Sequence, residues 1–258
     1  MRWKIEGDAT RPVITPEEHV RSAHGGEAAR LPEICVLFEM GMALPFIEKN
    51  WDTVSLSDRL PCFIADSRAI ALRERPQVCF VNGGYGAPAA VDTLETIRAL
   101  GVRQVLVVGM CGGFAREINV GDVVVPERIL CEEGTSFHYA DAPQFALPNG
   151  RLRGLVCERF AADWRIWDAP TVTSDAFYRQ TFAKEEAWRQ AGCAAVDMEA
   201  SALLNAAAFH GMPAAAVLLC SDKHPMREDE PRWRWGSGEF GEKRRKFVRA
   251  AVELAMEF

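Results

Sequence analysis

The sequence has no long uninterrupted apolar run. None of its apolar stretches reaches the roughly 18 residues that a membrane-spanning helix needs. The first eight residues, Met-Arg-Trp-Lys-Ile-Glu-Gly-Asp, also lack the apolar region of a secretory signal peptide. We therefore expect a chain without a membrane partner.

An excess of basic residues is missing as well. The chain has 30 Lys and Arg against 36 Asp and Glu, which gives a formal net charge of -6. Proteins that bind nucleic acid non-specifically normally carry a basic surface. The charge therefore counts against a nucleic-acid partner.

Motifs for metals and for the common cofactors are absent too. None of the eight cysteines forms a Cys-x-x-Cys pair, and His138, His210 and His224 show no metal-ligand spacing. The glycine-rich stretches fit neither Gly-x-Gly-x-x-Gly nor a P-loop, and no Gly-x-Ser-x-Gly elbow occurs. We predict no metal and no cofactor. Because most cysteines sit in apolar segments, we predict that they are buried and unpaired, which favours a cytoplasmic protein.

What is present is an alternation of strand and helix patterns. With 258 residues and 48% hydrophobic content, the chain fits one α/β domain over residues 1–258, with residues 1–31 as an N-terminal arm. The pattern predicts a parallel or mixed sheet covered by helices on both faces. Expected strands cover 34–38, 78–81, 104–108, 120–125, 129–131, 169–173 and 214–220, and expected helices cover 89–100, 184–191, 198–209 and 243–256. Residues 140–150 are expected to be a loop, and 223–241 a flexible flap or a packed surface loop.

Five short segments are expected at strand ends, where ligands collect in such sheets. They cover 83–88, 109–114, 174–178, 196–199 and 221–222. In them, Glu199 could accept hydrogen bonds from a vicinal diol or could simply begin a helix. Partial burial could raise the pKa of Asp222 so that it donates a proton, although a cap or turn residue is the alternative. Phe177 could stack on a planar base or belong to the core. The residues alone indicate an α/β enzyme or binder with a pocket for a sugar and a base.

Four segments in order resemble the nucleoside phosphorylase and nucleosidase superfamily, which includes purine nucleoside phosphorylase, uridine phosphorylase and AMP nucleosidase. These are the glycine turns at 84–88 and 108–113, the Thr-Ser-Asp-Ala-Phe-Tyr segment at 173–178, and Val-Asp-Met-Glu-Ala at 196–200, followed by Leu-Cys-Ser-Asp at 219–222. The resemblance implies a three-layer α/β/α fold around a mixed, partly barrel-like sheet. It also implies cleavage of the N-ribosidic bond of a purine nucleoside or nucleotide, by a homo-oligomer (dimer, trimer or hexamer) in which a neighbouring subunit often completes the pocket.

The resemblance also assigns roles to residues. Glu199 would bind the ribose 2′ and 3′ hydroxyls, with Met198 packed on the sugar and Tyr85 beside it. Asp222 would protonate the purine at N7 as the bond breaks. Three further residues would line the base: Phe177, Cys111 and Gly112.

Three positions differ from the phosphorylase pattern. Val107 and Met110 stand where phosphorylases carry an Arg and a Ser or Thr, and residues 38–42 lack the usual Gly-Asp-Pro-x-Arg. A phosphate site without a cation is hard to defend, so we favour hydrolysis, with Glu39 as the candidate base for water. Residues 133–136 (Glu-Gly-Thr-Ser) resemble a segment of AMP-nucleosidase-like chains.

Two alternatives remain open: phosphorolysis of purine or uridine nucleosides, and a non-catalytic nucleoside-binding protein. Three arginines of the 223–241 segment could meet a 5′-phosphate or the leaving purine, or face water: Arg227, Arg232 and Arg234.

Overall fold

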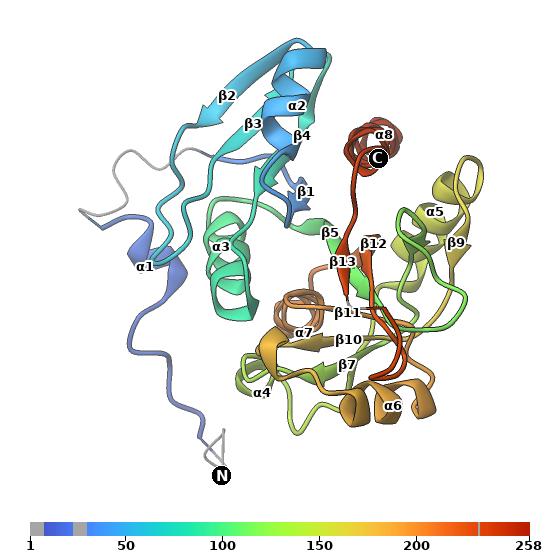
Figure 1. The fold of residues 1–258 in the computed structure, drawn as a ribbon. Coiled ribbons are helices and arrows are strands. Elements are labelled where there is room, and N and C mark those ends of the chain that lie inside the picture. The colour runs from blue at the N-terminus through green and yellow to red at the C-terminus, as the bar shows by residue number, and fades with distance from the viewer. Residues whose placement is uncertain (1–7, 23–29, 232) are drawn as a thin grey trace.

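One mixed sheet organises the structure. The computed structural model describes residues 8–22, 30–231 and 233–258, and within them thirteen strands form a single sheet in the order β2-β3-β4-β1-β5-β11-β10-β7-β8, with β12, β13, β6 and β9 branching from β5 (Figure 1). The strand bounds are β1 Ile34–Phe38, β2 Thr53–Ser57, β3 Ala69–Leu72, β4 Arg75–Asn82, β5 Gln104–Gly113, β6 Val123–Val124, β7 Ile129–Glu132, β8 Phe145–Ala146, β9 Ile166–Trp167, β10 Thr171–Ser174, β11 Ala195–Asp197, β12 Ala214–Lys223 and β13 Arg234–Trp235.

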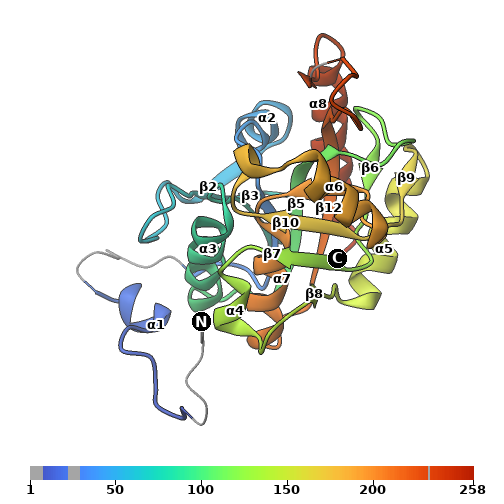
Figure 2. The same cartoon turned by 60° about the horizontal axis from the view of Figure 1, so that its bottom comes forward.

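Helices cover both faces of this sheet, as predicted for a three-layer α/β/α fold. The helix bounds are α1 Pro16–His19, α2 Ala43–Asn50, α3 Ala87–Ala99, α4 Ser136–Tyr139, α5 Gly150–Ala161, η1 (a 3₁₀ turn) Phe177–Arg179, α6 Phe182–Gln190, α7 Ala200–Phe209 and α8 Phe240–Ala255. Side chains alternate along β1, so that Cys35 and Leu37 join one core and Val36 and Phe38 the other. The first core includes buried residues of α3 and α7, and the second includes residues of α2, α5 and α8 (Figures 1 and 2).

Strand β5 is where the sheet branches. It pairs in parallel with β1 and β12, and its last two residues, Gly112 and Gly113, pair antiparallel with β11. The prediction that the strand stops at Gly109 is wrong, because residues 109–113 continue it rather than turn. The glycines lack side chains that would block the three neighbouring strands, so the backbone can remain extended there.

Strand β12 also continues past its predicted end. Residues 221–222 lie inside it, and the register with β5 shifts between Cys220 and Asp222. Such an irregularity re-aims side chains locally, and it is common beside active sites. Asp222 is therefore a strand residue at a bulge rather than a residue in a loop.

Several other boundaries differ from the sequence-based expectation. The helix expected from Met198 begins at Ala200, the strand expected over 120–125 is only β6, and residues 140–150 include β8. The sequence analysis missed α2, the β2–β3 hairpin, α5 and β9. The 223–241 segment returns along β12 through β13, so its described part packs against the sheet.

The described part of the N-terminal arm packs on α3. Helix α1 begins with a capping box between Thr15 and Glu18, and the Glu17 carboxylate lies 2.8 Å from the Arg98 guanidinium of α3. Residues 1–7 and 23–29 of the predicted arm lie outside the described residues.

All eight cysteines are free, and six of them are buried. No helix in the described part of the chain is long and apolar enough to cross a membrane.

Candidate active site

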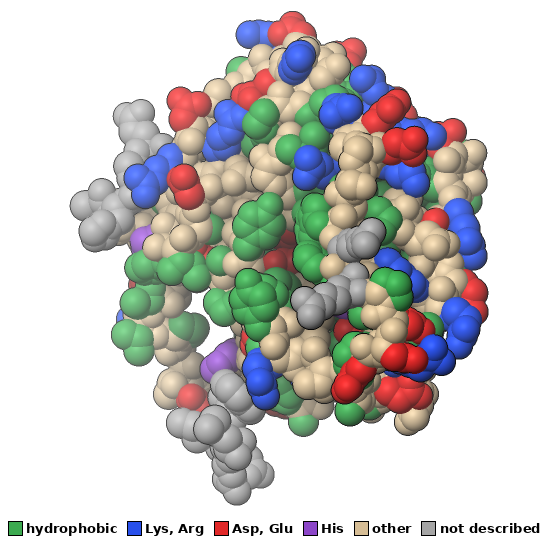
Figure 3. All heavy atoms as spheres, viewed as in Figure 1, with side chains coloured by type: hydrophobic (Ala, Val, Ile, Leu, Met, Phe, Trp, Pro, Cys, Tyr) green, Lys and Arg blue, Asp and Glu red, His purple; other side chains and the backbone are tan. Residues whose placement is uncertain are grey.

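A cavity of about 290 Å³ brings the predicted site residues together. It lies where β1, β5, β11 and β12 end or bulge, and η1 and β13 close its outer side. The seven residues predicted to bind the ribose or the base all line it: Tyr85, Cys111, Gly112, Phe177, Met198, Glu199 and Asp222. Glu39, the candidate base for water, lines it as well. Figure 3 shows acidic atoms at the bottom of a hollow whose rim is largely hydrophobic.

Glu199 is fixed at the junction between β11 and α7. Its side chain is 7% exposed, and its Oε1 accepts a hydrogen bond of 2.7 Å from the backbone N–H of Gly86, which has a φ of +84°. The start of the helix is capped by Asp197, whose Oδ2 accepts from the N–H groups of Glu199 and Ala200. Glu199 therefore does not cap its own helix, and its second oxygen remains available to a ligand.

Asp197 is a site residue that the sequence analysis did not single out. It accepts a 2.6 Å hydrogen bond from the Thr173 hydroxyl of β10 and lines the cavity beside Glu199. The signal that could have identified it is an Asp placed just before the predicted helix, because such a side chain often accepts from the first backbone N–H groups of a helix.

Three buried carboxyl groups face one another on this side of the cavity. Burial and then the charge of Asp197 raise the pKa of Glu199 to about 8, and burial raises the pKa of Asp197 to about 6. Burial, with added repulsion from Glu199 and Asp197, holds the pKa of Glu39 well above its ordinary value. Both Glu39 oxygens are buried without a hydrogen-bond partner. A Cβ at Gly83 would overlap this carboxyl group, so the close approach requires glycine.

Asp222 has the opposite electrostatic environment from the one predicted. Burial would raise its pKa, but hydrogen bonds from His224, Ser221 and Trp233 outweigh burial and lower it below the ordinary value. The Ser221 hydroxyl lies 2.6 Å from Oδ1, and the Trp233 indole N–H donates to Oδ2 at 2.5 Å. The expectation of a raised pKa at Asp222 is therefore wrong: the side chain is an ionised, hydrogen-bonded acceptor.

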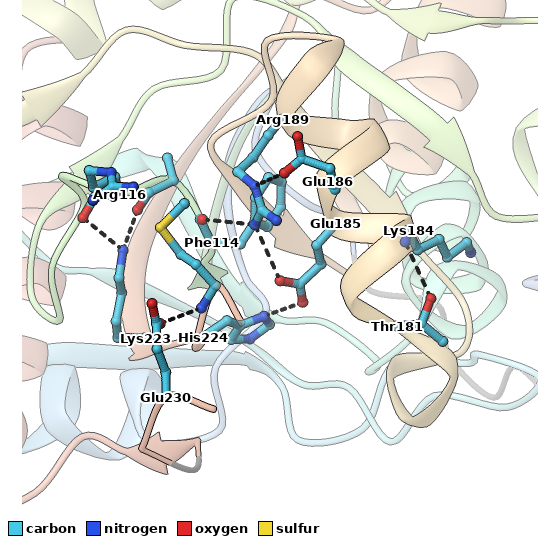
Figure 4. Close-up of polar contacts among 12 residues, drawn as sticks. Phe114, Arg116, Thr181, Lys184, Glu185, Glu186, Arg189, Lys223, His224 and Glu230 are labelled. Carbon is cyan, nitrogen blue, oxygen red and sulfur yellow. Dashed lines mark hydrogen bonds and ion pairs between the residues drawn. The ribbon is translucent and has the colours of Figure 1, made fainter. Parts of the chain in front are cut away.

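His224 is the main site residue that the sequence analysis missed. Its Nε2 lies 3.0 Å from Asp222 Oδ2, and its Nδ1 lies 2.7 Å from Glu185 Oε1 on α6. Burial alone would lower the pKa of the imidazole, but the two carboxylates raise it to about 9. Figure 4 shows the imidazole pointing at Glu185 from the strand side of the site.

The described residues around Glu39 include no Lys or Arg side chain that lines the cavity. Val107 is buried in the core. Met110 does line the cavity. Arg227 is 70% exposed in its side chain and lies 3.1 Å from Asp229, away from the cavity lining. Arg232 and the Arg234 side chain lie outside the described residues.

Phe177 lies at the mouth of the site rather than in the core. It is 49% exposed in η1 and also lines an outer hollow of about 520 Å³. The aromatic side chains around this outer hollow are Phe177, Tyr178, Phe182, Trp233 and Trp235. The core alternative for Phe177 is therefore wrong, while stacking on a base stays a prediction.

The 133–136 segment has a structural role in this chain. The buried Glu133 carboxylate accepts from the Ser136 N–H and from the Ser201 hydroxyl, both at 2.9 Å, and so ties α4 to α7. It does not line the cavity. Among the residues that the structure describes, no group of three or more His, Cys, Asp or Glu is placed to hold a metal ion.

Comparison with known proteins agrees with this fold. The sequence is 33% identical over 135 residues to a guanosine phosphorylase of Halorubrum lacusprofundi, an alignment that covers 52% of this chain and 56% of that protein. It is 28% identical over 181 residues to a DeoD-type purine nucleoside phosphorylase of an Exiguobacterium species, covering 67% of this chain and 73% of that one. The chain thus spans little more than half the length of the guanosine phosphorylase.

Two solved structures share the fold over most of the chain. The purine nucleoside phosphorylase of Toxoplasma gondii, in complex with immucillin-H, superposes with a TM-score of 0.76 at 15% identity, covering 95% of this chain and 97% of that one. The AMP nucleosidase of Bacteroides thetaiotaomicron superposes with a TM-score of 0.67 at 19% identity, covering 88% and 90%. The family description "Phosphorylase superfamily" matches residues 33–258. Because this match covers most of the chain, the protein belongs to the phosphorylase superfamily.

Proposed function

We propose that this protein releases the free base from a purine nucleoside or nucleotide by hydrolysing the N-ribosidic bond. The observation that carries the proposal is the charge of the cavity. Glu39, Glu199 and Asp197 lie on its sugar side, and among the described lining residues none is Lys or Arg. A phosphate dianion placed beside these three acids would have no described cation to balance its charge and would be repelled by each acid that ionises, whereas a neutral water molecule needs no counter-charge.

The geometry gives each acid a separate role. Glu199 has one oxygen held by Gly86, which leaves the other to accept from the ribose hydroxyls while Met198 packs on the sugar. Glu39 is the group that would take a proton from water, since its oxygens are unpartnered inside the cavity. Phe177, Cys111 and Gly112 would enclose the base, with Asp222 facing it. No cofactor is needed for this reaction.

Phosphorolysis is the second candidate, because the sequence relatives reported above are named phosphorylases. It requires a cation at the nucleophile side, and none of the described residues that line the cavity is Lys or Arg. We propose a homo-oligomer on separate grounds, which are the exposed apolar side chains of the N-terminal arm and the 63–64 loop. A cytoplasmic location is proposed from the eight free cysteines.

The test is a panel of purine nucleosides and nucleotides assayed with and without phosphate, with base and sugar products both identified. We expect base and free ribose (or ribose 5-phosphate) at a rate that phosphate does not change. In Glu39→Gln we expect about a 100-fold loss of kcat, the size of a typical general-base contribution. If the product is ribose 1-phosphate and no turnover occurs without inorganic phosphate, the reaction is phosphorolysis instead. No base release from any substrate would leave the binding-protein alternative.

A further inference from the structure

His224 connects Asp222, the buried acid of the proposed base site, to helix α6, which lies outside that site. The imidazole lies between Asp222 of β12 and Glu185 of α6, with both ring nitrogens within 3.0 Å of a carboxylate oxygen. Glu185 is buried, and its other oxygen has no hydrogen-bond partner. A Cβ at Gly112 would overlap His224 Nε2, so the imidazole also forms part of the wall against the base site. Each proton of this ring is therefore directed at an anion.

The surrounding charges favour a protonated ring. On α6, the Arg189 guanidinium lies 3.8 Å from the Glu185 carboxylate. It makes a shorter contact of 3.0 Å with Glu186 and donates to the Phe114 carbonyl (Figure 4). On β12, the Lys223 ammonium is bound to the carbonyls of Ala115 and Arg116. From the following segment, the Glu230 carboxylate accepts the Met226 N–H. The ring therefore faces two carboxylates directly, and the neighbouring cations have other partners.

Asp222 by itself is poorly suited to supply a proton. Both of its oxygens lie within hydrogen-bond distance of donors, Ser221 on one and His224 with Trp233 on the other, and such bonds favour the ionised form. It is also buried, whereas His224 additionally lines the outer hollow of about 520 Å³. A proton from solvent can therefore reach the imidazole more readily than the carboxylate.

We infer that His224, held as an imidazolium by Glu185, supplies through Asp222 the proton that the leaving purine takes up. The inference rests on the proposed base-releasing function. The Nε2 proton of His224 first moves to Asp222 Oδ2, which gives a neutral carboxylic acid and a neutral ring. As the C1′–N9 bond breaks, its electron pair stays with the purine, N7 takes that proton from Asp222, and Asp222 returns to the carboxylate. The neutral ring then regains a proton from solvent. His224 is thus a positioning residue that acts through Asp222, and Glu185 maintains its charge.

The experiment compares two leaving groups in three variants. Guanosine, inosine and adenosine are assayed beside their 7-methyl derivatives, whose N7 is already alkylated and needs no proton. In His224→Gln, we expect kcat for the best unmodified nucleoside to fall about 100-fold or more, with kcat for its 7-methyl derivative roughly unchanged. His210→Gln is the matched control, because His210 is similarly buried, lies 2.7 Å from the Glu95 carboxylate and is outside the site. It should leave both rates unchanged.

A pH profile separates this role from a structural one. Removing the Glu185 charge lowers the pKa of the imidazole, so in Glu185→Gln the alkaline loss of kcat should begin at lower pH than in the wild type, with full activity retained at acid pH. Equal losses on both kinds of substrate in His224→Gln, or an unshifted profile in Glu185→Gln, would overturn the inference. If the wild type releases base and His224→Gln keeps full activity, the inference is also overturned, but the proposed function is not. A wild type that releases no base refutes the proposed function, and the inference fails with it.

Discussion

At the scale of single residues, the raised pKa of Glu199 makes the stability of the protein depend on pH. Its pKa is raised to about 8 in the folded state from the ordinary value of 4.5. The folded protein therefore keeps a proton that the unfolded chain loses, so this group lowers stability progressively as the pH rises from about 4.5 to about 8. A carboxylate with such an environment is more easily explained by a role in binding than by a role in folding.

We expect Glu199→Gln to raise the melting temperature at pH 8 and to change it little near pH 4. The free-energy gain should approach roughly 1.4 kcal/mol for each pKa unit that the substitution removes. The same variant should lose about 100-fold in kcat/KM above pH 8, where the wild-type Glu199 is ionised and its charge-assisted bonds from two hydroxyls are lost on substitution. Thermal melts across pH and steady-state assays provide the two measurements.

Glu133→Gln is the control for Glu199→Gln. Glu133 is equally buried, but both of its oxygens are hydrogen-bonded between α4 and α7, outside the cavity. Glu133→Gln should lose a little stability and keep its kinetics. If Glu199→Gln instead melts at the same temperature as the wild type at pH 8, the raised pKa is refuted.

At the scale of elements, strand β5 presents two adjacent glycines to different surroundings. A Cβ on Gly112 would overlap His224 Nε2 in the wall of the cavity. A Cβ on Gly113 would lie 2.7 Å from Ile118 Cγ2 and 2.8 Å from Cys220 Sγ, in a small buried cluster. The same added methyl group is therefore expected to affect activity at one position and stability at the next.

We expect Gly112→Ala to abolish most base release, by at least about 30-fold, with a change in unfolding free energy below about 1 kcal/mol, because His224 is a side chain that can move. Gly113→Ala should cost about 1–3 kcal/mol through overpacking and should keep near-normal kcat in the folded fraction. Urea unfolding and kinetics on both variants decide the matter. If Gly112→Ala and Gly113→Ala lose the same amount of unfolding free energy, the two faces of β5 do not differ in how tightly they are packed.

The same elements show how far the sequence could predict the site. The alternation of strands and helices, and carboxylates placed directly after apolar strands, were enough to bring Glu199 and Asp222 to one place. The relation between Asp222 and His224 was not predictable in this way, because it depends on a bulge within β12 and on Glu185, which is 39 residues away from His224 in sequence. The residues of the glycine segment 109–113 were located correctly but given the wrong conformation, since glycine is compatible with both turns and extended strands.

At the scale of the whole molecule, the arm and the loop after β2 present an apolar surface. Val13 is 96% exposed and Phe63 62%, and Ile14 and Ile64 are also exposed. The loop is rigidly built: the Asp92 carboxylate of α3 accepts the backbone N–H groups of residues 63–65 at 2.8–3.1 Å. Phe63 also stacks on His19 beside a hollow of about 620 Å³. A patch that is apolar, exposed and held in a fixed conformation is typical of an interface between protein chains.

We therefore expect the wild type to have a mass that is a multiple of 28.6 kDa in light scattering. The double variant Phe63→Ser, Ile64→Ser should shift toward the 28.6 kDa monomer, because buried apolar area dominates homo-oligomer interfaces. Leu147→Ser is the matched control, since Leu147 is 67% exposed but does not line this hollow, and it should leave the mass unchanged. The patch holds the subunits together if the double variant has a lower mass in light scattering than the wild type and its far-ultraviolet circular dichroism stays native. A monomeric wild type would remove the oligomer from the proposal, and would also exclude a neighbouring subunit as the source of a phosphate-binding cation.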